Sequence, residues 1–148
     1  MTDPTQPTAL ESDPNWPSGP WTGFFLQTHA PAGKHRMDLH LTFHQGGMTG
    51  EGRDCVGPFT VRGRYEVVTG QCHWTKRYVG KHDVFYKGFN EGKGIWGVWE
   101  IPAAQNQGVT FRGGFHIWPK GMPDPTGDRL AEEADVPVET GELVTADR

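Results

Sequence analysis

The sequence predicts an all-β protein, an eight-stranded antiparallel barrel in up-and-down order, and three observations support this fold. Residues 71–101 divide into three segments, 71–78, 82–89 and 94–101, whose side chains alternate with a period of two. Five further segments alternate in the same way and are joined by short turns marked by glycine. The chain holds 21 glycines and 12 prolines and shows no extended helical period. Eight antiparallel strands can close into a barrel, and a two-sheet sandwich is the alternative.

The predicted strands follow one another closely along the chain. They cover residues 20–28, 36–44, 47–54, 58–66, 71–78, 82–89, 94–101 and 108–117, within a barrel domain of residues 20–119. Residues 1–19 are expected to be a disordered, proline-rich tail. Residues 120–148 are expected to be an acidic, mostly disordered tail with at most a short helix around Asp128–Ala134. Charge separates these parts, because residues 18–120 carry 12 Lys and Arg against 7 Asp and Glu while the whole chain has net charge −4.

The alternation assigns one face of every strand to the interior. The expected inward residues are Trp21, Gly23, Phe25, Gln27, Met37, Leu39, Leu41, Phe43, Met48, Gly50, Gly52, Asp54, Phe59, Val61, Gly63, Cys72, Trp74, Lys76, Tyr78, His82, Val84, Tyr86, Gly88, Ile95, Gly97, Trp99, Val109, Phe111, Gly113, Phe115 and Ile117. A slip of one residue would invert a strand, so agreement across eight strands supports the assignment. A bulge at Gly113-Gly114 is the place where the last strand could shift. The inward glycines indicate either close approach of neighbouring strands or an internal cavity.

The inward polar side chains converge on one end of the predicted barrel. Up-and-down order places the connections 29–35, 55–57, 79–81 and 102–107 together at that end, and the other end is apolar. The candidate ligand-binding residues are Gln27, Asp54, Lys76, Tyr78, His82, Tyr86 and Trp99. Lys76 is the most informative, because a buried ammonium needs a partner or water. It would either pair with Asp54 or reach the rim, or else contact an anion or carbonyl group inside the pocket.

The outward positions of the first strand and of the last three strands carry apolar side chains. Phe24, Leu26, Phe85, Trp96, Val98 and Trp118 should form one continuous patch after closure of the barrel. Patches of this kind usually mark an interface, so we expect a homo-oligomer.

Several function classes find little support in the sequence. The motifs of phosphate loops, nucleophile elbows and zinc proteases are absent from it. Asp38, His40 and His44 share an outward strand face on which side chains diverge, so no metal site or cofactor is expected. The outward basic residues Arg62, Arg64, Arg77 and Lys87 lack interleaved aromatic residues, which argues against nucleic acid as a partner.

The sequence also predicts the cellular location of the protein and the redox state of its two cysteines. No apolar run approaches the ~18 residues of a membrane span, and the first residues lack an apolar signal core. Cys55 and Cys72 are expected at opposite ends of the sheet, too far apart for a disulfide. Two free thiols are typical of a reducing compartment, so a cytoplasmic protein without membrane contact is expected.

Five spaced motifs carry a family resemblance. They are Trp21-x-Gly23-x-Phe25, Met48-x-Gly50-x-Gly52-x-Asp54-x-x-Gly57-x-Phe59-x-Val61-x-Gly63, Trp74-x-Lys76-x-Tyr78, Val84-x-Tyr86-x-Gly88 and Ile95-x-Gly97-x-Trp99. Residues 20–118 thereby resemble a calycin-like, or lipocalin-like, barrel. They are similar to the barrel domain of the F-box only protein 31 family, without its F-box segment, and more distantly to avidin-like barrels. The resemblance implies a binding barrel, with ligands in those families ranging from peptide ends to small cofactors.

Taken with the polar end of the barrel, the sequence leads to one functional hypothesis and two alternatives. The hypothesis is a non-catalytic binding module that takes a small molecule or a peptide chain end into the polar-rimmed open end of the barrel. The first alternative is a barrel enzyme of the isomerase or cyclase type that uses the same pocket. The second is a structural or assembly barrel whose interior is filled by side chains.

Overall fold

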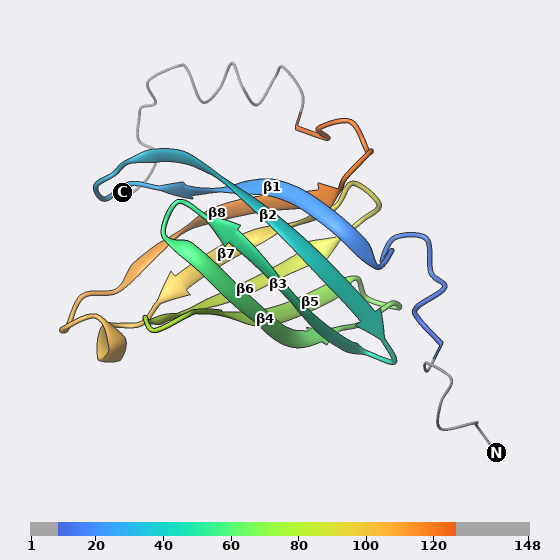
Figure 1. Ribbon diagram of the computed structural model, residues 1–148, viewed down its shortest axis with the longest axis horizontal. Coiled ribbons are helices and arrows are strands. Elements are labelled where there is room, and N and C mark those ends of the chain that lie inside the picture. Colours follow the sequence, from blue (N-terminus) through green and yellow to red (C-terminus); the bar gives the residue numbers. More distant parts are fainter. Residues whose placement is uncertain (1–8, 127–148) are drawn as a thin grey trace.

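The protein is a closed barrel of eight antiparallel strands in up-and-down order (Figure 1). The computed structural model describes residues 9–126. The strands are β1 (Gly19–Gln27), β2 (Gly33–His44), β3 (Gly47–Asp54), β4 (Gly57–Tyr65), β5 (Gln71–Tyr78), β6 (Asp83–Asn90), β7 (Ile95–Ile101) and β8 (Phe111–Pro119). Each strand pairs with the next, and β8 returns to pair with β1. The predicted fold class is confirmed, the sandwich is excluded, and the arrangement is consistent with a calycin-like barrel.

The strand register follows the predicted alternation. The pairing of β7 with β8 is continuous through Gly113 and Gly114, so the suspected bulge does not occur. Phe111, Phe115 and Ile117 therefore keep their inward orientation. Two expected inward residues lie outside the strands. Val109 precedes β8 in the connection from β7, where it is half exposed. His82 precedes β6 and is exposed. The connection from β7 to β8 contains a single 3₁₀ turn, Ala103–Gln105.

The inward glycines allow neighbouring strands to approach closely and do not create the cavity. A Cβ atom added to Gly97 would lie 2.1 Å from the Lys87 carbonyl oxygen and 2.6 Å from the Cα atom of Gly88 on β6. A Cβ atom on Gly63 would lie 2.5 Å from the Cα atom of Trp74. Backbone and aromatic groups already occupy these spaces, so a side chain there would force the strands apart. Of the two readings of these glycines, close strand approach is the correct one.

The barrel is closed at one end by the segment before β1. Trp16 is only 1% exposed and belongs to the core cluster. Its ring packs against Tyr65 at a centroid distance of 4.9 Å and against Phe43 at 5.4 Å. In Figure 1 the segment lies at the right-hand end, opposite the β1–β2 and β7–β8 connections. We call this the closed end and the opposite one the open end.

Polar contacts fix the same segment to the strands. The backbone N–H of Glu11 donates to the carbonyl oxygen of Phe43 at 2.9 Å, and the Phe43 N–H donates to the Ser18 hydroxyl at 2.9 Å. Tyr65 donates its hydroxyl proton to the Glu11 carboxylate at 2.5 Å. The expectation of a disordered tail throughout residues 1–19 is therefore wrong for residues 10–18. One large aromatic ring and several backbone hydrogen bonds stabilise them on the barrel.

The remaining expectations for the ends of the chain lie outside the described residues. These are the disorder of residues 1–8, the helix around Asp128–Ala134 and the disorder of the acidic tail from residue 127. Cys55 is exposed and Cys72 is buried, and both are free thiols as expected. Within residues 9–126, no helix is long and apolar enough to cross a membrane.

Candidate ligand-binding pocket

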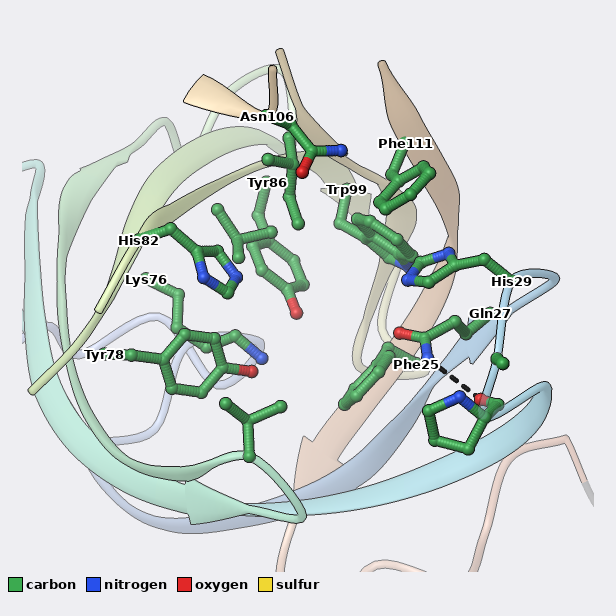
Figure 2. A pocket seen from close by; sticks show the side chains of 15 residues that line it. Phe25, Gln27, His29, Lys76, Tyr78, His82, Tyr86, Trp99, Asn106 and Phe111 are labelled. Atoms are coloured by element: carbon green, nitrogen blue, oxygen red, sulfur yellow. Dashed lines mark hydrogen bonds between the residues drawn. The ribbon is translucent and has the colours of Figure 1, made fainter. Parts of the chain in front are cut away.

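A cavity of about 280 Å³ occupies the open end of the barrel (Figure 2). It lies above a filled lower half, where Trp74, Phe115 and Tyr86 pack ring against ring. The residues that line it come from strands and from the connections at the open end. They are Phe25, Gln27, His29, Ala30, Pro31, Val56, Lys76, Tyr78, His82, Val84, Tyr86, Trp99, Ile101, Asn106 and Phe111. The volume is at the small end of the range for small-molecule sites.

A buried ion pair forms one side of the cavity floor. The Lys76 ammonium donates to Asp54 Oδ2 at 2.7 Å, and the side chains of Lys76 and Asp54 are 1% and 0% exposed. The Tyr78 hydroxyl donates to the same oxygen at 2.6 Å. The other carboxylate oxygen accepts the backbone N–H of Val56 at 2.9 Å. Three donors satisfy the carboxylate, as a buried charge requires.

Aromatic rings surround the Lys76 ammonium on the remaining sides. Its nitrogen lies 4.7 Å from the ring centre of Phe25, 4.8 Å from that of Phe59, and 5.0 Å from those of Tyr78 and Tyr86. These distances are within the range of cation–π attraction. Besides Asp54, the ammonium has one further hydrogen-bond partner within the described residues, the Met37 sulfur at 3.8 Å. An ammonium has three N–H groups, so one remains for the cavity that Lys76 lines.

Burial changes the acidity of the floor groups. It lowers the pKa of Lys76 to about 8, an effect that the neighbouring Asp54 carboxylate opposes. It also raises the pKa of Tyr78, helped by the hydrogen bond to Asp54, and raises that of Tyr86 well above its ordinary value. Both tyrosines therefore stay protonated near neutral pH, and Lys76 titrates much closer to neutrality than an exposed lysine.

Tyr86 presents its hydroxyl to the cavity. Its ring stacks on Trp74 at a centroid distance of 4.8 Å and meets Phe115 edge to face at 4.9 Å, which holds it in one orientation. Figure 2 shows the hydroxyl directed into the hollow. Within the described chain, no residue forms a hydrogen bond with this hydroxyl. The floor thus offers a ligand two hydrogen-bond donors, the Lys76 ammonium and the Tyr86 hydroxyl.

The upper walls are aromatic. His29 stacks on Phe111 with ring centres 3.9 Å apart and meets Trp99 edge to face at 6.1 Å. Burial lowers the pKa of His29, and the nearby His35 adds to this shift. The Trp99 indole N–H donates to the carbonyl oxygen of Leu26 at 2.9 Å, which fixes its ring against β1. A neutral imidazole, an indole and a phenyl ring form a flat apolar surface above the polar floor.

Hydrogen bonds also hold the connection from β1 to β2 at the mouth. The Gln27 side-chain amide donates to the carbonyl oxygen of Pro31 at 2.8 Å, and the His35 ring lies 2.7 Å from the same oxygen through Nε2. His35 Nδ1 lies 3.7 Å from the exposed Cys55 thiol. The loop that carries His29 is thereby tied to both flanking strands.

The structure brings six of the seven predicted ligand residues to the cavity lining. Gln27, Lys76, Tyr78, His82, Tyr86 and Trp99 line it. Asp54 does not, because it lies behind Lys76 and Tyr78 as their shared acceptor. Whether these residues bind a ligand stays a prediction. Phe25 and Phe111 were expected to point inward and could have been included, whereas His29 and Asn106 lie in connections that strand periodicity does not place.

The outer apolar patch is partly covered. Phe24 and Trp118 are only 4% and 8% exposed, and their rings meet edge to face at 6.1 Å. They are therefore unavailable as broad contact surfaces, contrary to expectation. Leu26, Phe85, Trp96 and Val98 are 37–55% exposed, and Phe89, which pairs with Trp96, extends the patch. The homo-oligomer stays a prediction that rests on these five residues.

The part of the chain that the structure describes contains no recognisable metal site. No group of three or more His, Cys, Asp or Glu side chains is placed to hold a metal ion there. Asp38 instead accepts hydrogen bonds from Thr22 at 2.9 Å and from Arg36 at 3.1 Å, on the outer surface.

Comparison with known proteins adds no relative. No protein-family model, no curated protein and no solved structure matches this chain.

Proposed function

We propose that this protein is a non-catalytic binding module whose open cavity takes a small molecule with a carbonyl group on a flat, apolar body. The observation that carries the proposal is the placement of two hydrogen-bond donors, Lys76 and Tyr86, on the floor of an aromatic cavity. Donors at the bottom of an apolar pocket select a ligand by the position of its acceptor. The flat rings above them complement a planar body.

The charges at the cavity floor favour a ligand with a neutral carbonyl group over a ligand with a carboxylate. Lys76 and Asp54 form a pair with no net charge, since their charged atoms lie 2.7 Å apart. A ligand carboxylate would add a negative charge that no other cation at the floor balances among the described residues. An uncompensated buried charge is strongly unfavourable, whereas a neutral carbonyl accepts hydrogen bonds without adding charge. For the same reason, a peptide chain end with a free carboxylate fits this floor less well than a neutral carbonyl compound.

The sequence resemblance supports the same class of function. Residues 20–118 are similar to calycin-like barrels, including the barrel domain of the F-box only protein 31 family and, more distantly, avidin-like barrels. The resemblance implies a binding barrel. The interior here agrees with this use, because its closed end is sealed by Trp16 while the cavity lies at the other end.

Titration followed by NMR tests the proposal through the tryptophan indole N–H signals. Cinnamamide, which is flat and carries a neutral carbonyl, should shift the signal of Trp99 in the cavity lining. The signal of Trp21 should stay in place, because its indole N–H is bonded to the Pro17 carbonyl oxygen near the closed end. Cinnamate, of the same shape with a negative charge, should bind at least tenfold more weakly.

Two tryptophan substitutions on one strand provide matched controls. Ile101→Trp places a large ring in the cavity lining and should abolish the shift of the Trp99 signal that cinnamamide causes. The new tryptophan adds one indole N–H signal of its own to the spectrum. Val98→Trp adds a ring on the outer surface of β7, where Val98 is 55% exposed, and should leave binding unchanged. Absence of any Trp99 response to flat aromatic amides, ketones and aldehydes would overturn the proposal.

A further inference from the structure

We propose that Lys76 condenses with an aldehyde held in this cavity, so that the barrel carries its ligand as a covalent imine with Asp54 as counter-ion. This inference rests on the proposed binding function and names the ligand class more narrowly. Lys76 is one of the residues that line the cavity and its side chain is 1% exposed, so a carbonyl carbon can reach its nitrogen only through the open end. Lysines in apolar pockets are the usual partners of carbonyl compounds in such condensations.

The charges of the site are preserved through the reaction. The ammonium and an aldehyde give a protonated imine and one water, so the cation stays on the same nitrogen. The carbonyl oxygen leaves with two protons from the ammonium, and the third proton remains on the iminium nitrogen. Asp54 at 2.7 Å thus faces a single positive charge before and after the condensation. The rings of Phe25 and Phe59, within 4.8 Å of the nitrogen, stabilise either cation.

The groups around Lys76 can move the protons that the condensation requires. Asp54 accepts a proton from the ammonium, which frees the nitrogen lone pair to attack the carbonyl carbon. One proton then passes from the nitrogen to the carbonyl oxygen, which becomes a hydroxyl group, and Tyr86 donates a hydrogen bond to this oxygen. Asp54 then returns its proton to the nitrogen, which passes a proton on to the hydroxyl, and this group leaves as water while the C=N bond forms.

The titratable neighbours of Lys76 come from several elements. Asp54 ends β3, Tyr78 lies on β5 beside Lys76, and Tyr86 lies on β6. Cys55, in the β3–β4 turn, slightly opposes the lowering of the Lys76 pKa through its electrostatic interaction with the ammonium. The faces contributed by β1, β2 and β4 are uncharged, being Phe25, Met37 and Phe59. Burial lowers the pKa of Lys76 to about 8, so an appreciable fraction of the amine is unprotonated in mildly alkaline solution. The condensation should therefore proceed faster at pH 8 than at pH 6.

Reductive trapping tests this chemistry on the unmodified protein. The full chain is incubated at pH 8 with trans-cinnamaldehyde and cyanoborohydride, and the products are analysed by intact mass and peptide mapping. The expected product is a single alkyl group on Lys76, which forms at least tenfold faster than adducts at exposed lysines such as Lys87. Cinnamamide, which occupies the cavity without condensing, should slow the reaction at Lys76 and leave that at Lys87 unchanged.

Variants provide the controls. Lys87→Met should leave the fast adduct in place, and Lys76→Met should remove it. Lys76→Met leaves the buried Asp54 carboxylate without its cation and could impair folding. The double variant Lys76→Met/Asp54→Asn removes both charges and should lack the fast adduct as well. Mapping of the unmodified protein gives the answer even if both variants fail to fold.

The outcomes separate this inference from the binding function. If cinnamamide shifts the Trp99 signal but Lys76 reacts no faster than Lys87, the imine proposal is overturned and the binding function stands. If neither compound binds, both proposals are contradicted. Fast modification of Lys76 that cinnamamide fails to slow would also contradict the imine proposal, because the aldehyde would then not react from the cavity.

Discussion

Removing Lys76 alone should destabilise the barrel more than removing the whole ion pair. In Lys76→Met, the Asp54 carboxylate stays buried and keeps only the Tyr78 hydroxyl and the Val56 N–H as donors. Breaking one half of a buried pair costs about 3–5 kcal/mol, and the two remaining donors favour the lower end, about 3 kcal/mol. In Lys76→Met/Asp54→Asn, the neutral amide has the same shape and still accepts a hydrogen bond. The free energy of unfolding should then return to within about 1 kcal/mol of the wild-type value.

Urea unfolding at pH 7 measures these differences, provided that the dependence on urea is the same for all variants. Lys87→Met is the matched control, because it makes the same substitution at an exposed position of β6 and should change stability by no more than about 0.5 kcal/mol. A loss below about 1 kcal/mol in Lys76→Met would refute the argument. So would a double variant that is less stable than the single one, because the buried carboxylate would then not be the source of the loss.

Four further predictions concern pH, the closed end, the outer surface and the two thiols. The pKa of Lys76 is about 8 in the folded protein and 10.5 ordinarily, so between these pH values the unfolded chain binds more protons than the folded one. The free energy of unfolding of the wild type, relative to that of Lys76→Met, should therefore rise by about 3 kcal/mol from pH 8 to pH 10.5. A difference that does not change with pH in urea unfolding would contradict this. Trp16→Ala should lower the free energy of unfolding by about 3–5 kcal/mol, whereas Val68→Ala, at a position that is 93% exposed, should change it by no more than about 0.5 kcal/mol; equal losses would disprove the sealing role of Trp16. Sedimentation velocity should show a homo-oligomer that Trp96→Asp dissociates, and a wild-type monomer at high concentration would exclude that interface. Cys55 should react at once with a thiol reagent, while Cys72, whose pKa burial raises to about 12, should react only after unfolding.

The barrel could be predicted because its strands obey a simple local rule. Alternate side chains of an antiparallel strand face opposite sides, so Trp74, Lys76 and Tyr78 had to share the interior once Trp74 was placed there. The pairing of Lys76 with Asp54 followed from the same alternation and from the order of the connections. It was one of the readings left open by the sequence, and the 2.7 Å contact between the two buried side chains establishes it, whereas contact of Lys76 with a ligand stays a prediction.

Features outside the strands could not be predicted in this way. Trp16 stands in a proline-rich segment without periodicity, and only contact with Phe43 and Tyr65 shows that it seals the barrel. His29 and Asn106 reach the cavity from connections whose paths depend on tertiary contacts. The inward glycines carried an ambiguous signal, because a missing side chain can leave a space or let a neighbouring strand fill it. The backbone contact of Gly97 with β6 shows the second outcome.

Native mass spectrometry of the protein purified from its own source tests the central claim most directly. One small neutral carbonyl compound should be bound per wild-type chain, and none to Ile101→Trp, in which a ring fills the cavity beside Lys76 and Tyr86. Val98→Trp, altered on the outer surface of the same strand, should retain the compound. A ligand-free wild-type protein, or a compound retained equally by Ile101→Trp, would contradict the claim that the open end of the barrel is a binding site.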